Sequence, residues 1–327
     1  MIGKQIGQYK IEKRLGSGAN ADVFLAKDCN TNIYYAVKIF YDGDFHKKER
    51  NLLKILNSKA IPKLKDCFPI PNGYCIVMDY EEGKPLSGYI GKREMDFKTK
   101  LSVLESLLTV LNYLHTRPDP VIHGDLKPEN IIVTKEGEVR LLDFGSAFFL
   151  DEMPEKMHAT VGYAALEILK GKCDQRSDVY SFGKIMISLM TEKNPSVYGD
   201  HPETGLLIRM GMKPKYARLA KRCIEDNPAK RFPSAKELRK HFKNCRKKEV
   251  FQNAVAVLER IIFETGGGIL SLFGLYVHFI GGKPVGKRIL AVGIFLLLVK
   301  LLTDNFRRKK AEGEYEIRGS LFLSGEK

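Results

Sequence analysis

One loop constrains this chain more than any other part of it. The stretch VIHGDLKPENIIV, residues 121–133, places His, Gly, Asp, Lys, Glu and Asn between two short apolar runs. Short apolar runs bounded by such residues are typical of buried strands. Polar side chains this dense between two strands indicate a catalytic loop, because loops held by a rigid scaffold often carry catalysis. We therefore expect Asp125 to be functional, and Gly124 beside it needs an explanation.

A second polar motif comes a short distance later. LLDFG occupies residues 141–145, so Asp143 comes 18 residues after Asp125. That separation suits a short hairpin that returns to the same site. We expect the two carboxylates to lie in one site.

The order of hydrophobic patterns predicts an α+β fold of two lobes with a cleft between them. The first third of the chain is rich in short runs of β-branched and aromatic residues broken by Gly, Asn and Asp, which is typical of strands. From about residue 97 onward, most of the sequence has the 3.6-residue apolar period of helices. Strands are expected at residues 9–15, 21–28, 33–40 and 74–80, and helices at 46–56, 99–115 and 177–190.

A glycine-rich turn and a lysine precede these helices. In LGSGANADV, Gly16 and Gly18 stand between two expected strands and let the backbone approach a phosphate. A Walker A loop would need Gly-Lys-Ser/Thr opening a helix, and Ala21 replaces the third glycine of a G-x-G-x-x-G pattern, so a plain hairpin turn explains the stretch equally well. Lys38 closes an apolar strand, and Glu49 in the next helix is positioned to hold its ammonium group.

Taken together, these motifs resemble the protein-kinase family. HGDLKPEN and LLDFG are followed, in the order of the family, by ATVGYAALE, SDVYSFG and NPAKRF. The resemblance covers roughly residues 9–245 and is to bacterial eukaryote-like (Hanks-type) Ser/Thr kinases of the HGD (non-RD) variant. It implies a bilobal fold with a β-rich N-lobe and an α-helical C-lobe. Two alternatives stay open: a pseudokinase acting as a binding module, and a small-molecule kinase of the aminoglycoside-phosphotransferase type.

The resemblance implies roles for individual residues. Asp125 accepts the proton of the substrate hydroxyl, Lys127 lies near the γ-phosphate of ATP, and Asn130 and Asp143 hold Mg²⁺, with Mn²⁺ as a possible substitute. Met78 is the gatekeeper, residues 79–81 form the hinge, and Glu49 follows Lys38 at a shorter spacing than the family leads us to expect. The implied nucleotide-binding residues are Gly16, Ser17, Gly18, Val23, Ala36, Lys38, Glu49, Met78, Asp79 and Glu81.

Other residues are expected to be structural. By the same resemblance, Glu167 and Arg231 form a buried ion pair, and Asp178 hydrogen-bonds the backbone of the catalytic loop. Gly124 stands where many family members have an arginine that pairs with a phosphate on the activation segment. The hydroxyl side chains between Gly145 and Glu167 are Ser146, Thr160 and Tyr163. Because the last two match positions that shape the substrate-binding end, we expect no regulatory phosphosite there. Packing by Phe148 and Phe149 is the alternative means of ordering the segment.

The remainder of the chain predicts attachment to a membrane. Two apolar runs, 269–280 and 289–299, follow the basic stretch RKHFKNCRKK, and the formal net charge is +15. Basic clusters beside apolar segments favour anionic lipid headgroups as a partner, with nucleic acid as the less favoured alternative. The expected parts are a kinase domain at 9–245, a basic amphipathic linker helix at 246–265, two short transmembrane helices at 266–302 and a polar cytoplasmic tail at 303–327. This organisation places a kinase that acts on proteins at the cell membrane, with its kinase domain cytoplasmic. A single span, or a hairpin that lies in one leaflet, is the alternative. The oligomeric state, the substrate and the activating signal stay open.

Overall fold

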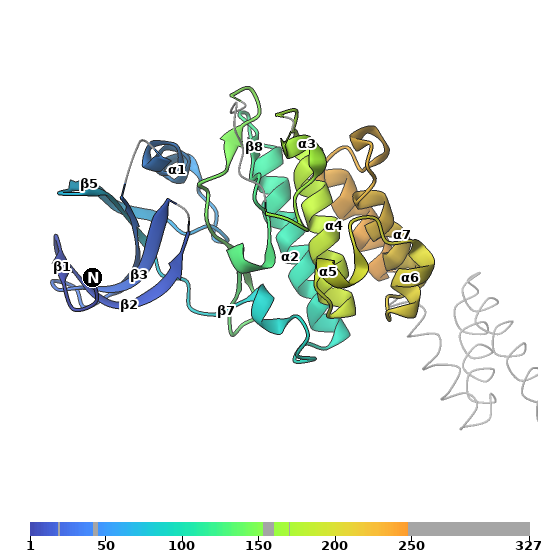
Figure 1. Cartoon of the computed structure of the whole chain (residues 1–327), viewed down its shortest axis with the longest axis horizontal. Helices are drawn as coiled ribbons and strands as arrows, with labels where there is room; N and C mark the ends of the chain where they lie inside the picture. Colours follow the sequence, from blue (N-terminus) through green and yellow to red (C-terminus); the bar gives the residue numbers. More distant parts are fainter. Residues whose placement is uncertain (19, 42–44, 153–159, 170, 248–327) are drawn as a thin grey trace, which may run out of the picture. The chain divides into compact units, whose positions relative to one another are not determined.

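A computed structural model describes residues 1–18, 20–41, 45–152, 160–169 and 171–247 (Figure 1). The chain divides into two compact units, Met1–Arg246 and Lys247–Lys327. The linker, the two membrane spans and the tail predicted after residue 247 lie outside the described residues. Among the described residues, no helix combines the length and the apolar character needed to cross a bilayer.

The N-terminal part of the first unit is a six-stranded antiparallel sheet in the order β1-β2-β3-β4-β6-β5 (Figure 1). The predicted strands all form, whereas the short β1 and the edge strand β5 were not predicted. Pro69 lies in β5, where an edge position tolerates the missing backbone donor. The bounds are β1 Gln5–Ile6, β2 Tyr9–Ser17, β3 Ala21–Asp28, β4 Tyr34–Phe40, β5 Leu64–Ile70 and β6 Gly73–Asp79.

The pairing of the strands decides which side chains share a face of the sheet. Val23 pairs with Lys38, and Ala36 pairs with Met78. Successive side chains of a strand point to opposite faces, so these four residues lie on one face. That face belongs to the main core and is covered in part by α1 (Phe45–Ile55), while the other face buries its own cluster around Tyr9 and Phe24.

The C-terminal part of the unit is helical and is built around α2 (Phe97–His115) and α4 (Gln175–Thr191). Asp96 caps α2 by accepting a hydrogen bond from the backbone N–H of Thr99 at 2.7 Å, and Asp174 caps α4 through the N–H of Arg176 at 2.8 Å. Side-chain caps of this kind contribute about 1 kcal/mol each. Further helices are α3 Leu166–Leu169, α5 Pro195–Tyr198, α6 Thr204–Arg209 and α7 Pro214–Cys223, with short 3-10 turns at Leu86–Tyr89, Pro128–Asn130 and Pro228–Lys230.

Short strands frame the loop that carries Asp125. Strand β8 (Val121–Ile122) enters the loop, and β9 (Ile131–Val133) leaves it. Strand β9 pairs with β10 (Val139–Leu141) and with β7 (Lys84–Pro85), while β8 pairs with β11 (Phe148–Phe149). The hairpin from β9 to β10 returns the chain so that Asp143 follows directly, as the spacing predicted.

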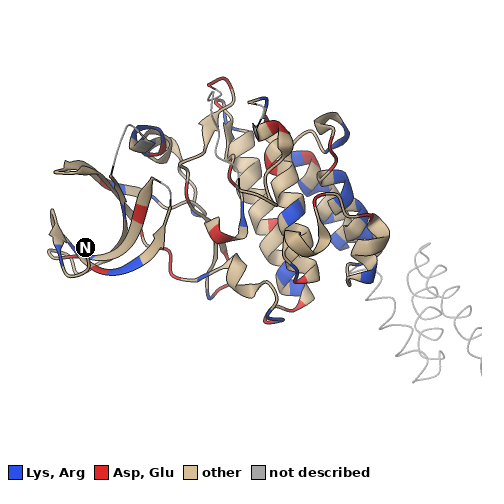
Figure 2. Cartoon of the chain, in the orientation of Figure 1, with Lys and Arg blue, Asp and Glu red and all other residues tan. Residues whose placement is uncertain are grey.

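The basic stretch begins within a helix that spans residues 235–247, which we call the terminal helix. Leu238 and Phe242 are fully buried on one side of it. On its other sides Arg246 and Lys243 form ion pairs with Glu105 of α2. Both α7 and this helix are rich in lysine and arginine (Figure 2). Part of the basic stretch therefore packs against the rest of the first unit.

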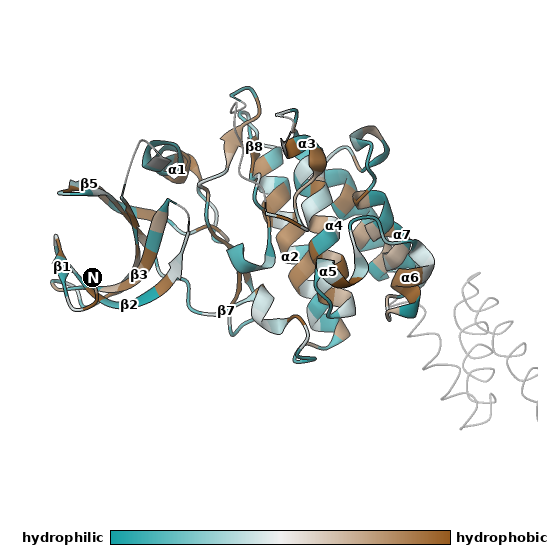
Figure 3. Ribbon diagram, viewed as in Figure 1, coloured by the Kyte–Doolittle hydropathy of each residue, from teal (hydrophilic) through white to brown (hydrophobic). Residues whose placement is uncertain are grey.

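Helix α4 lies at the centre of the helical part and is buried along most of its length (Figure 3). Its close contact with α7 depends on Gly183. A Cβ atom at that position would lie 2.5 Å from the Cβ of Cys223 and 2.9 Å from Cγ2 of Ile224. The absence of a side chain at Gly183 thus sets how near the two helices approach.

Candidate active site

A buried lysine joins the sheet to the helical part. The Nζ of Lys38 donates to Oε2 of Glu49 at 2.6 Å and to Oδ1 of Asp143 at 2.7 Å. Lys38 comes from β4, Glu49 from α1 and Asp143 from the stretch after β10. The contact between Lys38 and Glu49 is present, although their short separation in the sequence made Glu49 the least secure of the expected site residues. Three residues that are far apart in sequence therefore meet at one ammonium group.

The charges in this trio stabilise one another. Burial would lower the pKa of Lys38, but the carboxylates of Glu49 and Asp143 outweigh it and raise that pKa. Burial would likewise raise the pKa of Asp143, but the Lys38 ammonium holds it at about 2. Burial raises the pKa of Glu49 despite the same ammonium. Lys38 stays cationic and Asp143 anionic near neutral pH, which is the charge pattern that a triphosphate with a metal ion requires.

The second centre is Asp125. Its Oδ2 accepts a hydrogen bond from Nζ of Lys127 at 2.6 Å, and its Oδ1 accepts one from the Thr160 hydroxyl at 2.6 Å. Lys127 also donates to the hydroxyl oxygen of Thr160 at 2.9 Å, and the Asn130 amide donates to the backbone carbonyl of Asp125 at 2.9 Å. The sequence predicted Asp125, Lys127 and Asn130 here, whereas the contact of Thr160 with the carboxylate was missed. No local signal identifies a partner 35 residues away.

Asp178 of α4 holds the backbone that presents Asp125. Its Oδ2 accepts the backbone N–H of His123 at 2.9 Å, and its Oδ1 accepts that of Gly124 at 3.1 Å. Nε2 of His115, at the end of α2, lies 2.9 Å from the same carboxylate. The predicted hydrogen bonds of Asp178 to the loop backbone are confirmed, and His115 is an addition that the sequence did not suggest.

Gly124 has a second reason to be glycine. Its φ is 76°, in the left-handed region that side chains disfavour. The sequence alone indicated only the missing guanidinium group. The backbone conformation shows that any side chain at this position would also strain the turn before Asp125.

The segment after Asp143 begins with a strand pair. Phe148 pairs with Ile122 and Phe149 with Val121, so β11 lies beside the strand that enters the catalytic loop. Phe148 is fully buried, and Nζ of Lys48 lies 5.3 Å from the centre of its ring. We expected the packing of this phenylalanine to be a means of ordering the segment without a phosphate. Phe148 is packed in this way where the segment begins.

The glycine-rich turn is fixed from its sides. The N–H of Gly18 donates to the carbonyl of Ala21 at 2.8 Å. Arg14 donates to the Ser17 hydroxyl at 2.7 Å and to Asp22, whose pKa it lowers to about 2. Ala21 is 7% exposed and belongs to the main core. The methyl group that replaces a third glycine therefore fills core space instead of blocking the turn.

Residues expected to contact the adenine and the hinge lie along the same face as Lys38. Ala36 and Met78 are both 9% exposed and form a strand pair, and Val23 is partly buried beside them. After Asp79 the chain leaves β6, and Oε2 of Glu81 accepts a hydrogen bond from Arg140 of β10 at 3.0 Å. Arg140 ties the expected hinge to the hairpin that carries Asp143, a role that the sequence did not indicate.

The donor set tests whether a divalent cation fits. Mg²⁺ binds oxygen ligands and usually takes only one or two carboxylates besides water and phosphate. Asp143 has a side chain that is 45% exposed, and the Asn130 amide uses its nitrogen on Asp125, which leaves an oxygen on each residue for a cation. No group of three or more His, Cys, Asp and Glu residues suited to a metal occurs among the described residues. Two oxygen donors of this kind fit Mg²⁺ bound together with phosphate.

Glu167 and Arg231 support the site from a distance. The Arg231 guanidinium contacts Oε1 of Glu167 at 2.5 Å and its Oε2 at 3.1 Å, and Arg231 is 3% exposed. The predicted buried ion pair is confirmed. Breaking such a pair costs about 3–5 kcal/mol of stability, because one charge stays buried without its partner.

Comparison with known proteins agrees with this geometry. Residues 9–243 match the family model described as "Protein kinase domain". The serine/threonine-protein kinase cds1 of Schizosaccharomyces pombe is 28% identical over 272 residues, which cover 73% of this chain and 59% of that protein. Serine/threonine-protein kinase D of Synechocystis is 29% identical over 269 residues, 71% of this chain and 51% of that protein.

A third relative is bacterial. The serine/threonine-protein kinase PrkC of Bacillus subtilis is 28% identical over 210 residues, 60% of this chain and 32% of that protein. The matches thus span between about a third and three-fifths of the length of these relatives. The family match covers most of the present chain, from the start of β2 into the terminal helix. The chain therefore belongs to the protein kinase family, on its serine/threonine side.

Proposed function

We propose that this protein transfers the γ-phosphoryl group of Mg²⁺-ATP to serine and threonine hydroxyls of other proteins. The observation that carries the proposal is the position of Lys38, whose buried ammonium group bridges Glu49 and Asp143. Phosphoryl transfer depends on positioned charge more than on covalent chemistry of the enzyme. A pseudokinase has no need to hold all of these groups in place.

Each charged residue of the site has its own role in the proposed transfer. Lys38, steadied by Glu49, contacts the α- and β-phosphates, and the backbone of the glycine-rich turn approaches them from the other side. Asp125 orients the substrate hydroxyl and accepts its proton. Lys127 neutralises charge beside the γ-phosphate, and Thr160 fixes the rotamers of both residues through its hydroxyl.

Asn130 and Asp143 would hold the metal ion. When bound, Mg²⁺ or Mn²⁺ supplies charge that neutralises the phosphate oxygens and orients them. Val23, Ala36 and Met78 supply the apolar face for the adenine, and the backbone of residues 79–81 serves as the hinge. This assignment rests on the resemblance and on the shared face of the sheet.

The test compares the wild-type protein with Asp125→Asn and Asp143→Asn. Asp125→Asn should lower phosphorylation of a protein substrate by about 10²–10⁴-fold and leave nucleotide affinity nearly unchanged, because it removes a proton acceptor and no phosphate contact. Asp143→Asn should weaken the binding of Mg²⁺-ATP itself. Phosphate transfer from labelled ATP measures the first effect, and titration with a fluorescent ATP analogue at fixed Mg²⁺ measures the second. Near-normal transfer by Asp125→Asn would disprove the assignment, and a wild-type protein that binds ATP without transfer is the pseudokinase.

We also propose that the protein is attached to the cell membrane with its kinase domain in the cytoplasm. The support is the sequence: apolar runs at 269–280 and 289–299 with basic clusters before and after them. The basic stretch 239–248 would add attraction to anionic lipid, worth about 1 kcal/mol for each lysine or arginine near the surface. Nucleic acid is the competing partner for the same charges, since any polyanion releases counterions on binding.

A further inference from the structure

A short strip of chain joins the sheet to the helical part of the unit. We call it the crossing strip; it comprises residues 80–83, between β6 and β7. At its first end, Asp79 of β6 pairs with Tyr35 of β4. At its second end, Lys84 of β7 pairs with Val133 of β9. These strand pairs fix both ends of the crossing strip, one on each part of the unit.

The middle of the crossing strip is held by a guanidinium group. Nε of Arg140 donates to Oε2 of Glu81 at 3.0 Å, and its Nη2 donates to Oε2 of Glu138 at 2.7 Å. The side chains of Arg140 and Glu81 are 19% and 18% exposed, whereas that of Glu138 is 61% exposed. Burial raises the pKa of Glu81, although the charge of Arg140 opposes it. The contact between Arg140 and Glu81 is therefore shielded from water and salt, so it contributes more than an exposed ion pair does.

Arg140 is also fixed relative to the proposed metal ligands. It lies in β10, which pairs with β9, and Asp143 follows three residues later. Between them, the N–H of Leu142 donates to the carbonyl of Asn130 at 2.8 Å. Since Asn130 and Asp143 are the proposed ligands of the metal ion, the backbone of Arg140 is tied to the end of the site that would hold the phosphates.

A bound ATP has to reach the hinge and the metal ligands at the same time. In the proposed function the backbone of residues 79–81 takes the adenine, while Asp143 and the metal ion take the phosphates. Binding is productive only when both ends are held in register. We propose that Arg140, acting through Glu81, is a positioning residue that holds the hinge at the distance from Asp143 that Mg²⁺-ATP requires. This inference rests on the proposed kinase function and adds to it a residue that acts through its neighbour.

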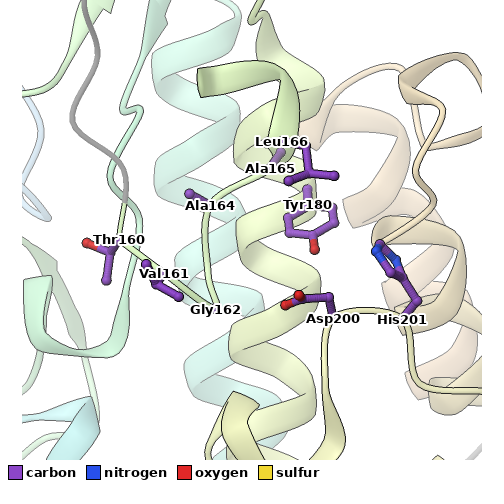
Figure 4. Close-up of a pocket in the computed structure, with 9 residues that line it drawn as sticks. All are labelled: Thr160, Val161, Gly162, Ala164, Ala165, Leu166, Tyr180, Asp200 and His201. Carbon is purple, nitrogen blue, oxygen red and sulfur yellow. The ribbon is translucent and has the colours of Figure 1, made fainter. Parts of the chain in front are cut away.

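The end of the site that would accept the substrate hydroxyl is separate from this contact. Thr160, which contacts the Asp125 carboxylate at 2.6 Å, lines a hollow together with Tyr180 and Asp200 (Figure 4). None of the described residues that line this hollow belongs to the crossing strip or to β10. Loss of the contact between Arg140 and Glu81 should therefore raise the KM for ATP and leave the KM for a protein substrate unchanged.

Nucleotide titrations with the full-length protein test the inference. The affinities for Mg²⁺-ATP and for adenosine are measured by competition with a fluorescent ATP analogue. Arg140→Met keeps an aliphatic stem and should weaken Mg²⁺-ATP by on the order of tenfold, but adenosine by at most about twofold, because adenosine reaches only the hinge and needs no register. Arg140→Lys should recover part of the affinity, since lysine keeps the charge but lacks the fork that bridges two carboxylates. Adding Arg140→Met to Glu81→Gln should cost little more than either change alone.

The matched control is Lys135→Met. Lys135 pairs with Glu82 at 2.8 Å, so this ion pair joins the same hairpin to the same strip, but its side chains are 77% and 70% exposed. The substitution changes the net charge equally and should leave both affinities as in the wild type, because exposed pairs contribute little. Equal losses for adenosine and Mg²⁺-ATP in Arg140→Met would show a damaged hinge and no lost register. Unchanged affinity for both would show that the contact positions nothing, and either result overturns the inference.

The proposed function fails by a different result. A wild type that binds Mg²⁺-ATP and transfers no phosphate overturns the kinase function, while the ratio of the two affinities still decides whether Arg140 sets the register. A wild type that binds neither nucleotide overturns both. Urea melts show whether each variant is folded, and Glu81→Gln, which keeps the shape of its side chain, gives the same comparison if Arg140→Met does not fold.

Discussion

Gly124 combines two constraints in a single residue. Its N–H donates to Asp178, and its φ of 76° is one that a side chain would strain. In addition it brings no cation to the loop. An arginine here would be a partly buried charge that needs an anion, and a phosphate on the activation segment is the usual one. In this chain the activation segment begins with the strand pair between β11 and β8.

We therefore predict activity without phosphorylation of the activation segment. Enzyme treated with a phosphatase should keep the initial rate of untreated enzyme, measured on a protein substrate. Gly124→Arg should bring no gain and should destabilise the loop by about 1–2 kcal/mol, because an L-residue in the left-handed region carries that cost. Gly137→Ala is the control for the backbone cost, since Gly137 has a φ of 78° outside this loop. A large loss of rate on dephosphorylation, restored by preincubation with ATP, would contradict the prediction.

At the scale of secondary-structure elements, the packing of α4 on α7 depends on a glycine, Gly183. A methyl group at Gly183 would meet Cys223 and Ile224 within 3.0 Å, so the two helices would have to separate. Overpacking of this kind costs about 1–3 kcal/mol. The same two helices bury Val179, Phe182, Tyr216 and Ala220.

Gly183→Ala should lower the free energy of unfolding by about 1–3 kcal/mol, read from urea melts at constant m-value. The matched variant is Gly205→Ala in α6. A Cβ there has only the Arg209 side chain nearby, at 3.8 Å, so helix propensity should dominate and raise stability by up to about 1 kcal/mol. Equal effects of both substitutions would show that close packing at Gly183 does not limit the fold.

Sequence patterns predicted some elements better than others. Strands β2, β3, β4 and β6 and helices α2 and α4 carry strong periodicity or long apolar runs, so their existence could be predicted directly. Strand β5 was missed because Pro69 weakens its pattern and only its edge position explains it. Asp125, Asn130 and Asp143 were predicted because their motifs are contiguous. The contacts of Thr160, His115 and Arg140 were not predicted, since each residue acts through a partner brought near by the path of a distant segment.

Over the whole molecule, charge and apolar sequence are unevenly distributed. The terminal helix and α7 are rich in lysine and arginine (Figure 2). The apolar runs come after them in the sequence. The core of the first unit includes Phe242 of the terminal helix. Attachment to a membrane would use the apolar runs that follow this helix in the sequence.

A protein truncated after Lys247 should stay folded and active, and should no longer sediment with membranes. The full-length protein should remain with the membrane pellet after nuclease treatment and a high-salt wash, because apolar insertion is insensitive to salt whereas binding to nucleic acid is not. Sedimentation and flotation of cell lysates measure both. A full-length protein found wholly in the soluble fraction without detergent would disprove attachment, and its release by nuclease would identify nucleic acid as the partner.

If the chain is tethered to a membrane beyond residue 247, the ion pairs between the terminal helix and Glu105 would carry mechanical load. Tension applied there would load Arg246 and Lys243 first, and through Glu105 it would reach α2. That helix ends at His115, whose ring contacts the same Asp178 carboxylate that holds the backbone before Asp125. A pull on the tether would thereby reach the helix whose last residue, His115, contacts the carboxylate that holds the backbone of the catalytic loop.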